Sequence, residues 1–150
     1  MARRPILVLS VSVGAGHIRC AEAVLEALLA ADPTRSVEHV DVLELAPAWV
    51  RRFYRESFLR VAELSRGLAY RIYVGTDGAG PDEGPWGHAA ERIMFRRFRR
   101  FLAGSRWSDA VCTHFLPLQL SHPHEARPMH LVVTDWDIHR FWAQPTAASF

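Results

Sequence analysis

The chain has 150 residues, of which 49% are hydrophobic and 23% are charged. This balance is typical of one folded domain of ordinary size and excludes an intrinsically disordered chain. The formal net charge of +2 is too small to indicate a particular partner, although all 18 basic residues are arginine. No apolar run approaches the roughly 20 residues that a membrane-spanning helix needs.

The N-terminal part is predicted to alternate strand, helix and strand. Residues Pro5 to Val13 are aliphatic and show little alternation, which predicts a strand buried on both faces of a parallel sheet. A turn is expected at Ser12 to Gly16, and helical spacing follows from His17 to Ala31. Ser36 to Leu45 alternates and predicts a second strand. This order indicates a right-handed crossover and an α/β fold.

The middle of the chain is predicted to be mostly helical. One helix is expected at Trp49 to Ser65 and another at Trp86 to Ala103, with a short helical segment at Gly67 to Val74 and a loop at Thr76 to Pro85. On a helical wheel, the helix at Trp49 to Ser65 has its apolar residues on one side and most of its charged residues on the opposite side. The apolar side carries Trp49, Val50, Phe53, Tyr54, Ser57, Val61 and Leu64; the charged side carries Arg51, Arg52, Arg55, Glu56 and Glu63.

Two further strands are predicted in the C-terminal part, at Asp109 to Thr113 and Met129 to Thr134. The segment between them is short for a parallel crossover, so the helix there is expected to have barely two turns. The predicted fold class is α/β, with a Rossmann-like parallel sheet flanked by helices. Cys20 and Cys112 have no metal-binding or redox spacing and are expected to be reduced thiols.

The turn after the first strand contains glycines at positions 14 and 16 and then His17. Glycine allows a tight turn or close approach of a ligand, and the helix start offers free N–H groups. A dinucleotide fingerprint would need glycine where Arg19 stands, and the Walker pattern is also absent, so both kinds of nucleotide site are disfavoured. A simple strand-to-helix turn explains the two glycines equally well.

His17 is the candidate with chemistry. It lies in the first helical turn at the carboxyl end of the first strand, where α/β proteins bind ligands. A neutral imidazole there can accept a proton from a hydroxyl group. A helix-capping or solvent-facing histidine is the other interpretation of this position.

Three segments then resemble, in order, the N-terminal domain of the diacylglycerol glycosyltransferases. They are LVLSVSVGAGHIRCAEAVLEAL at Leu7 to Leu28, VCTHFLP at Val111 to Pro117, and VVTDWDIHRFW at Val132 to Trp142. That family covers monogalactosyldiacylglycerol synthases and processive diacylglycerol glucosyltransferases, which are similar to glycosyltransferase family 28. The resemblance implies the acceptor half of a two-domain GT-B fold and hexose transfer from a UDP-sugar to diacylglycerol, with inversion. The UDP-sugar-binding domain is expected outside this chain.

By this resemblance, His17 is the base and Gly14 and Gly16 leave room for the acceptor. The acceptor-binding residues implied are Thr113, His114, Thr134 and His139. Asp135 is a second catalytic candidate, and either Asp135 or Asp137 is expected to orient His17 or His139, or to act as the base itself. Helix N-capping by the threonines and aspartates is the competing interpretation. Trp142 matches the family motif and is expected to pack.

An arginine-rich helix is predicted to touch an anionic membrane surface. Its apolar arc carries Met94, Phe95, Phe98, Phe101 and Leu102, and the other arc carries Arg92, Arg96, Arg97, Arg99 and Arg100. The membrane contacts expected are Arg96, Arg97, Phe98, Arg99, Arg100 and Phe101. The same pattern describes any surface helix packed on a core. Location is expected to be cytoplasmic, peripheral to the inner face of the plasma membrane.

Neither a metal nor a cofactor is expected beyond the UDP-sugar donor. His122 and His124 lie in a proline-rich loop without matching ligands. Nucleic acid is not an expected partner, because no recognition motif accompanies the arginines. Two other functions stay open: a non-catalytic lipid- or partner-binding module, and a nucleotide-binding Rossmann domain.

Overall fold

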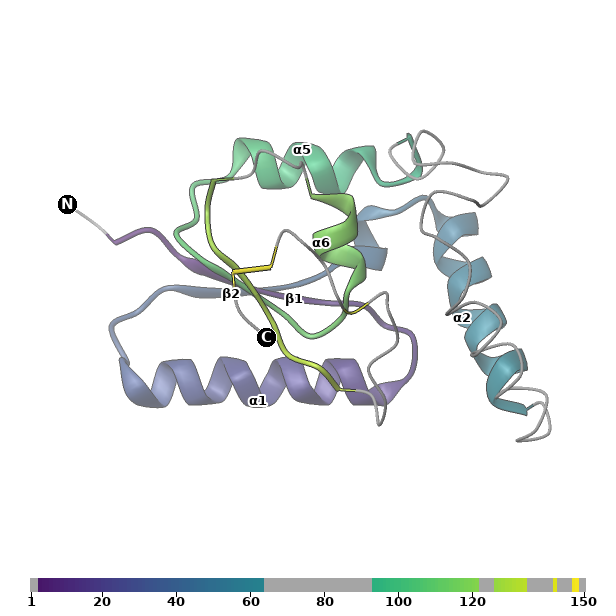
Figure 1. Cartoon of the computed structure of the whole chain (residues 1–150), viewed down its shortest axis with the longest axis horizontal. Coiled ribbons are helices and arrows are strands. Elements are labelled where there is room, and N and C mark those ends of the chain that lie inside the picture. The colour runs from purple at the N-terminus through teal and green to yellow at the C-terminus, as the bar shows by residue number, and fades with distance from the viewer. Residues whose placement is uncertain (1–2, 64–92, 122–125, 135–141, 143–146, 149–150) are drawn as a thin grey trace.

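The computed structural model describes residues 3–63, 93–121, 126–134, 142 and 147–148. The predicted segments at 67–74 and 76–85, and the start of the helix predicted from residue 86, lie outside these ranges. In chain order the elements are β1 (Ile6–Ser10), α1 (Ala15–Ala31), β2 (Val37–Asp41), the 3-10 helix η1 (Val42–Leu45), α2 (Ala48–Glu63), α5 (Arg96–Gly104), β3 (Ala110–Cys112), α6 (Leu116–Leu120) and β4 (Met129–Leu131) (Figure 1).

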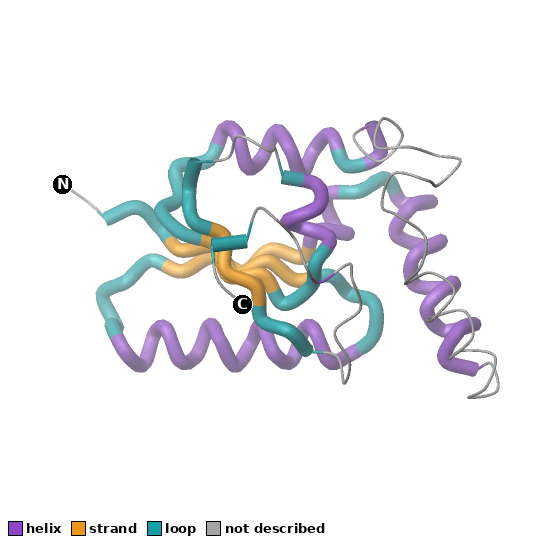
Figure 2. Tube along the Cα trace, in the orientation of Figure 1, coloured by secondary structure: helices purple, strands orange, loops and turns teal. Residues whose placement is uncertain are grey.

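The four strands form one all-parallel sheet in the order β2-β1-β3-β4. Figure 2 shows the strands at the centre, with α1 along one side and α5 along the other. The predicted Rossmann-like α/β class is confirmed. Because the strands are parallel, the carboxyl ends of β1, β3 and β4 lie at the same edge, and this edge brings together residues that are far apart in sequence.

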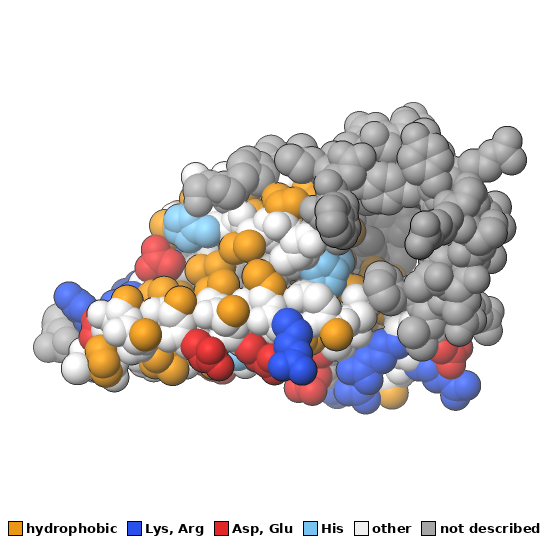
Figure 3. All heavy atoms as spheres, turned by 90° about the horizontal axis from the view of Figure 1, so that it is seen from below, with side chains coloured by type: hydrophobic (Ala, Val, Ile, Leu, Met, Phe, Trp, Pro, Cys, Tyr) orange, Lys and Arg blue, Asp and Glu red, His pale blue; other side chains and the backbone are white. Residues whose placement is uncertain are grey.

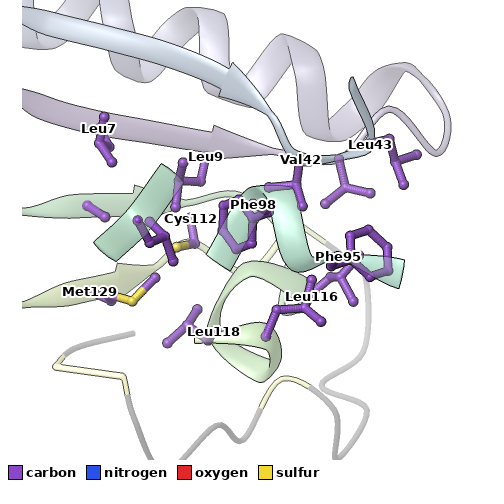
Figure 4. Packing of buried hydrophobic residues seen from close by; sticks show 14 of the residues in the cluster. Leu7, Leu9, Val42, Leu43, Phe95, Phe98, Cys112, Leu116, Leu118 and Met129 are labelled. Carbon is purple, nitrogen blue, oxygen red and sulfur yellow. The ribbon is translucent and has the colours of Figure 1, made fainter. Parts of the chain in front are cut away.

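The main core lies on the sheet face opposite α1. The registers pair Leu7 with Ala110 and Leu9 with Cys112, and these in turn with Met129 and Leu131. All six side chains are at most 1% exposed, because α5 and α6 cover this face (Figure 4). From the helices, Phe95, Phe98, Leu116 and Leu118 fill the space above the strands. Burial raises the pKa of the Cys112 thiol, and both cysteines are free, as predicted.

Arg127 and Trp107 close the C-terminal end of α5. The Arg127 guanidinium donates to the carbonyl oxygens of Leu102 (2.9 Å) and Ser105 (3.1 Å) and lies 3.8 Å from the centre of the Trp107 ring. The Trp107 indole also donates to Leu102, at 3.1 Å. These donors satisfy carbonyl groups that a helix end otherwise leaves without partners.

The predicted element boundaries shift where side chains cap the backbone. The second strand ends at Asp41, earlier than predicted, because its carboxylate accepts the N–H of Leu43 at 3.0 Å and starts η1. Helix α1 begins at Ala15 instead of His17. Helix α6 has five residues, so the prediction of a very short helix before β4 is confirmed.

Helix α2 buries a narrower stripe than the wheel predicted. Val50 is 1% exposed and the Tyr54 ring packs edge-on against Phe95 at 5.9 Å, but Trp49 and Phe53 are 63% and 64% exposed. The apolar side of the wheel is therefore only partly covered. In Figure 1, α2 follows η1 and extends away from the sheet, and of its described side chains Val50 and Tyr54 pack on the core.

The expected membrane contact of Phe98 is wrong. Phe98 is fully buried and Leu102 is 4% exposed, while Phe101 is half-buried and packs on the same core. The apolar arc of α5 covers the sheet, so it is not available to a bilayer. The opposite arc does face solvent: Arg96, Arg97 and Arg100 are exposed, and Arg99 is half-buried.

Candidate functional site

The candidate site begins at the turn between β1 and α1. Gly14 is the N-cap of α1 and has φ 87° and ψ 171°, a combination that is strained for every residue with a side chain. No side chain caps this helix end and its first turn has no acidic residue. The turn directs the next residues of α1, including His17, toward the carboxyl ends of β3 and β4.

The imidazole of His17 is held through one ring nitrogen. Nδ1 lies 2.9 Å from the carbonyl oxygen of Thr113 and 2.7 Å from the hydroxyl oxygen of Thr134. A carbonyl oxygen only accepts, so the Nδ1 position that faces it carries the hydrogen. The lone pair is then on Nε2, which has no hydrogen-bond partner among the residues that the structure describes.

Access to this ring is narrow. His17 is 8% exposed, so it is mostly but not wholly enclosed. Figure 3 views the molecule from the side of α1, where histidine surface is visible among the other side chains. The competing interpretation of a solvent-facing histidine is therefore wrong, and the ring is buried with limited access.

Thr113 supports His17 from the end of β3. Its hydroxyl donates to the backbone carbonyl of His17 at 2.9 Å, while its own carbonyl faces the His17 ring. Each residue thus binds the backbone of the other through its side chain. Thr113 is fully buried, so the prediction that it contacts the acceptor is wrong. Its hydroxyl instead joins the first turn of α1 to the sheet.

His114 packs against the other side of the same ring. The His17 and His114 rings meet edge to face, with their centres 4.7 Å apart. The Nδ1 of His114 accepts the N–H of Leu116 at 3.0 Å, which leaves the hydrogen on its Nε2. Burial, reinforced by the neighbouring His17, lowers the pKa of His114 to about 3. Hence His114 is neutral near pH 7, and its observed contacts are with α6 and with the rings of His17, Phe115 and Trp142.

The rings of His114, Phe115 and Trp142 form an aromatic wall beside His17. The Trp142 ring lies 6.2 Å from that of His17, 5.9 Å from that of His114 and 5.7 Å from that of Phe115. Trp142 is 1% exposed, which confirms the prediction that it packs. The buried Trp142 ring lowers the polarity around His17, which strengthens the hydrogen bonds of that imidazole.

Of the other residues predicted for this site, the structure places Thr134 but does not describe Asp135 and His139. Thr134 reaches His17, as described above, and its half-buried hydroxyl is also 3.4 Å from the Thr113 carbonyl. Asp135 and His139 lie outside the described residues. The expectation that a carboxylate orients His17 is not met at Nδ1, where the partners are a carbonyl and a hydroxyl.

A second polar cluster beside the glycine turn was not predicted. Asp41 accepts the N–H of Ser12 at 3.2 Å, and Arg55 donates to the Ser12 hydroxyl at 2.8 Å and lies 4.0 Å from Asp41. The wheel of α2 put Arg55 on a charged, solvent-facing side, and its spacing carries no signal for this contact. The cluster arises because η1 turns α2 back toward the end of β1, and it fixes the residues that precede Gly14.

Comparison with models of protein families, with curated proteins and with solved structures finds no match. Among the described residues, no group of three or more histidine, cysteine, aspartate or glutamate side chains is arranged to hold a metal ion. None of the helices in the described ranges is both long and apolar enough to cross a bilayer.

The two glycines of the turn are expected to respond oppositely to alanine. Gly14→Ala should lower the free energy of unfolding by about 1–3 kcal/mol, because a side chain is strained at its backbone angles. A methyl group at Gly16 meets nothing within 4 Å, so Gly16→Ala should be neutral or stabilise α1 by up to about 1 kcal/mol. Urea unfolding of the two variants measures the difference. Equal destabilisation by both would contradict the assigned turn geometry.

Proposed function

We propose that this chain is the acceptor-binding domain of a glycosyltransferase that transfers a hexose from a UDP-sugar to diacylglycerol with inversion. The observation that carries the proposal is the state of His17, whose Nδ1 is held by Thr113 and Thr134 while Nε2 has no partner in the described ranges. The UDP-sugar is bound by a separate domain, which is a partner of this one.

The proposed reaction requires this chain to accept one proton. Nε2 of His17 accepts the proton of the free diacylglycerol hydroxyl as that oxygen forms a bond to the anomeric carbon. The bond from that carbon to UDP breaks, and UDP leaves with the electron pair. Attack from the face opposite UDP inverts the anomeric centre. The aromatic wall of His114, Phe115 and Trp142 keeps water, a competing acceptor, away from the base.

The meeting of the three resembling segments supports this proposal. His17 is 96 residues from Thr113 and 117 residues from Thr134, yet all three are within hydrogen-bond distance. The segments that carry the resemblance therefore meet around one imidazole at the carboxyl edge of the sheet, where α/β proteins bind ligands. The open space beside Gly16 leaves room for an acceptor at the same turn.

Acceptor binding tests the proposal on this chain by itself. The protein, carrying histidine labelled with ¹⁵N in the ring, is titrated with dioctanoylglycerol, and the ring signals of His17 are followed by NMR. A saturable shift of the Nε2 signal is expected. The control ligand is dioctanoylglycerol acetylated at its free hydroxyl, which should leave Nε2 unshifted. Absence of any shift with dioctanoylglycerol would overturn the proposal.

We also propose that the exposed arginines of α5 contact anionic headgroups, without insertion of the α5 aromatics. Replacing Arg96, Arg97 and Arg100 together by glutamine should weaken binding to phosphatidylcholine–phosphatidylglycerol vesicles by about 100-fold, at about 1 kcal/mol for each arginine. Co-sedimentation at low and high salt measures this. Arg19→Gln, at an exposed arginine of α1, is the control and should have little effect.

Unchanged sedimentation of the triple variant would contradict the α5 contact. Sedimentation of the unaltered chain with no response of His17 to dioctanoylglycerol would favour a non-catalytic lipid-binding module instead. The exposed Trp49 and Phe53 of α2 are the apolar residues that such a module would offer.

A further inference from the structure

The hydrogen-bond pattern around His17 assigns a role to the two threonines that lie against its Nδ1. We propose that Thr113 and Thr134 are positioning residues that hold His17 as the tautomer protonated on Nδ1 and so make Nε2 the basic atom. The catalytic meaning of this assignment rests on the proposed function. The tautomer itself is a property of the free protein and is measured without turnover.

The Thr134 hydroxyl can donate to Nδ1 or accept from it, but the Thr113 carbonyl can only accept, and this favours one direction of hydrogen bonding. With the hydrogen on Nδ1, the ring donates to the Thr113 carbonyl at 2.9 Å and shares that hydrogen with the Thr134 oxygen at 2.7 Å. The Thr134 hydroxyl can then direct its own hydrogen to the Thr113 carbonyl at 3.4 Å. With the hydrogen on Nε2 instead, a ring lone pair would face a buried carbonyl oxygen that has lost its donor, which is unfavourable.

Thr113 and Thr134 act from different directions. The Thr113 hydroxyl donates to the backbone carbonyl of His17 and fixes the position of its backbone, while the Thr113 carbonyl fixes the orientation of the ring. Thr134 comes from the segment after β4 and supplies the second oxygen to Nδ1. When Nε2 takes a proton, the Nδ1 hydrogen of the resulting cation faces two neutral oxygens. A buried carboxylate is therefore not needed to orient this ring.

The test is the tautomer of His17 in the protein with ¹⁵N-labelled histidine rings. His17 is assigned from the signals that disappear in His17→Gln. The unaltered chain should show a proton-bearing Nδ1 and a proton-free Nε2. Thr134→Val keeps the shape of the side chain but removes one acceptor, so the population with the hydrogen on Nε2 should rise by about 2- to 10-fold, the value of one net hydrogen bond.

Conservative variants separate positioning from packing. Thr134→Ser and Thr113→Ser keep their hydroxyls and should retain the original tautomer. Thr113→Val keeps the backbone carbonyl that faces Nδ1, so it should change the tautomer population less than Thr134→Val does. Thr34→Val removes a threonine hydroxyl that binds Asp32, far from His17 in the fold, and should change nothing at His17. In the transferase, the valine variants should lower kcat more than they raise KM.

Two results would overturn the assignment: an unaltered chain with the hydrogen mainly on Nε2, or Thr134→Val with the tautomer population of Thr134→Ser. The first needs no variant, so it is decisive even where a valine variant fails to fold. If the expected tautomer is found but dioctanoylglycerol leaves His17 unchanged, the proposed function fails while the assignment of Thr113 and Thr134 stands.

Discussion

Replacement of His17 by asparagine is expected to lower the rate of hexose transfer by about 10²- to 10⁴-fold, the usual contribution of a general base. The side-chain amide of asparagine can take the position of Nδ1 and still donate to the Thr113 carbonyl, which accepts from His17 at 2.9 Å. No atom of asparagine takes the position of Nε2. The variant therefore removes the base while keeping the hydrogen bond that orders the turn.

The measurement is glycolipid formation by this chain together with the proposed UDP-sugar-binding domain, from UDP-sugar and vesicles that contain diacylglycerol. His39→Asn is a matched control, because His39 is a histidine of β2 whose Nε2 is hydrogen-bonded to Ser10 at 2.8 Å. This control should lose some stability and keep its transfer rate. If His17→Asn kept more than about a tenth of the rate, Nε2 would not be the base and Asp135 would become the leading candidate.

The fold was predictable from local pattern because each element carries its own signal. The aliphatic run of β1, the helical spacing of α1 and the short strands β3 and β4 all occur near their predicted positions. Because the strands are parallel, their carboxyl ends share one edge, which is why His17, Thr113 and Thr134 were expected there. Boundaries such as the end of β2 were not predictable, since they depend on one carboxylate and one N–H group.

The roles of the site residues were less predictable than their location. A threonine at the end of a strand can face a ligand, cap a helix or bind its neighbour, and the sequence does not distinguish these. In the structure, the Thr113 hydroxyl donates to the His17 carbonyl and the His114 ring accepts from Leu116. Both choices depend on side-chain rotamers and on how closely α1 approaches β3, which are properties of the packed domain.

Amphipathic helices raise the same difficulty, since an apolar arc does not reveal what covers it. The arcs of α2 and α5 both look suited to a core or a bilayer. The structure covers Phe98 of α5 with the sheet and leaves Phe53 of α2 64% exposed. The difference follows from the position of each helix relative to the sheet and η1, which a helical wheel cannot represent.

Replacement of Phe98 by alanine is therefore expected to lower the free energy of unfolding by about 3–5 kcal/mol, the range for a phenylalanine removed from a core. Phe98 is fully buried among residues of α5, α6 and the sheet (Figure 4). The matched control is Phe53→Ala on α2, which should change stability by no more than about 0.5 kcal/mol. Urea unfolding of both variants in the absence of lipid measures the difference.

The outcome for Phe98 also decides how the domain can meet a membrane. A domain of this size has a free energy of unfolding of about 5–15 kcal/mol. Removal of the Phe98 ring from the core would cost much of that free energy. The domain would therefore be largely unfolded if this ring inserted into a bilayer. The membrane contact proposed for α5 would then rely on its exposed arginines, and it should weaken with salt. If Phe98→Ala instead kept full stability and lost vesicle binding, the ring would belong to a membrane surface and α5 would have to leave the sheet when it binds.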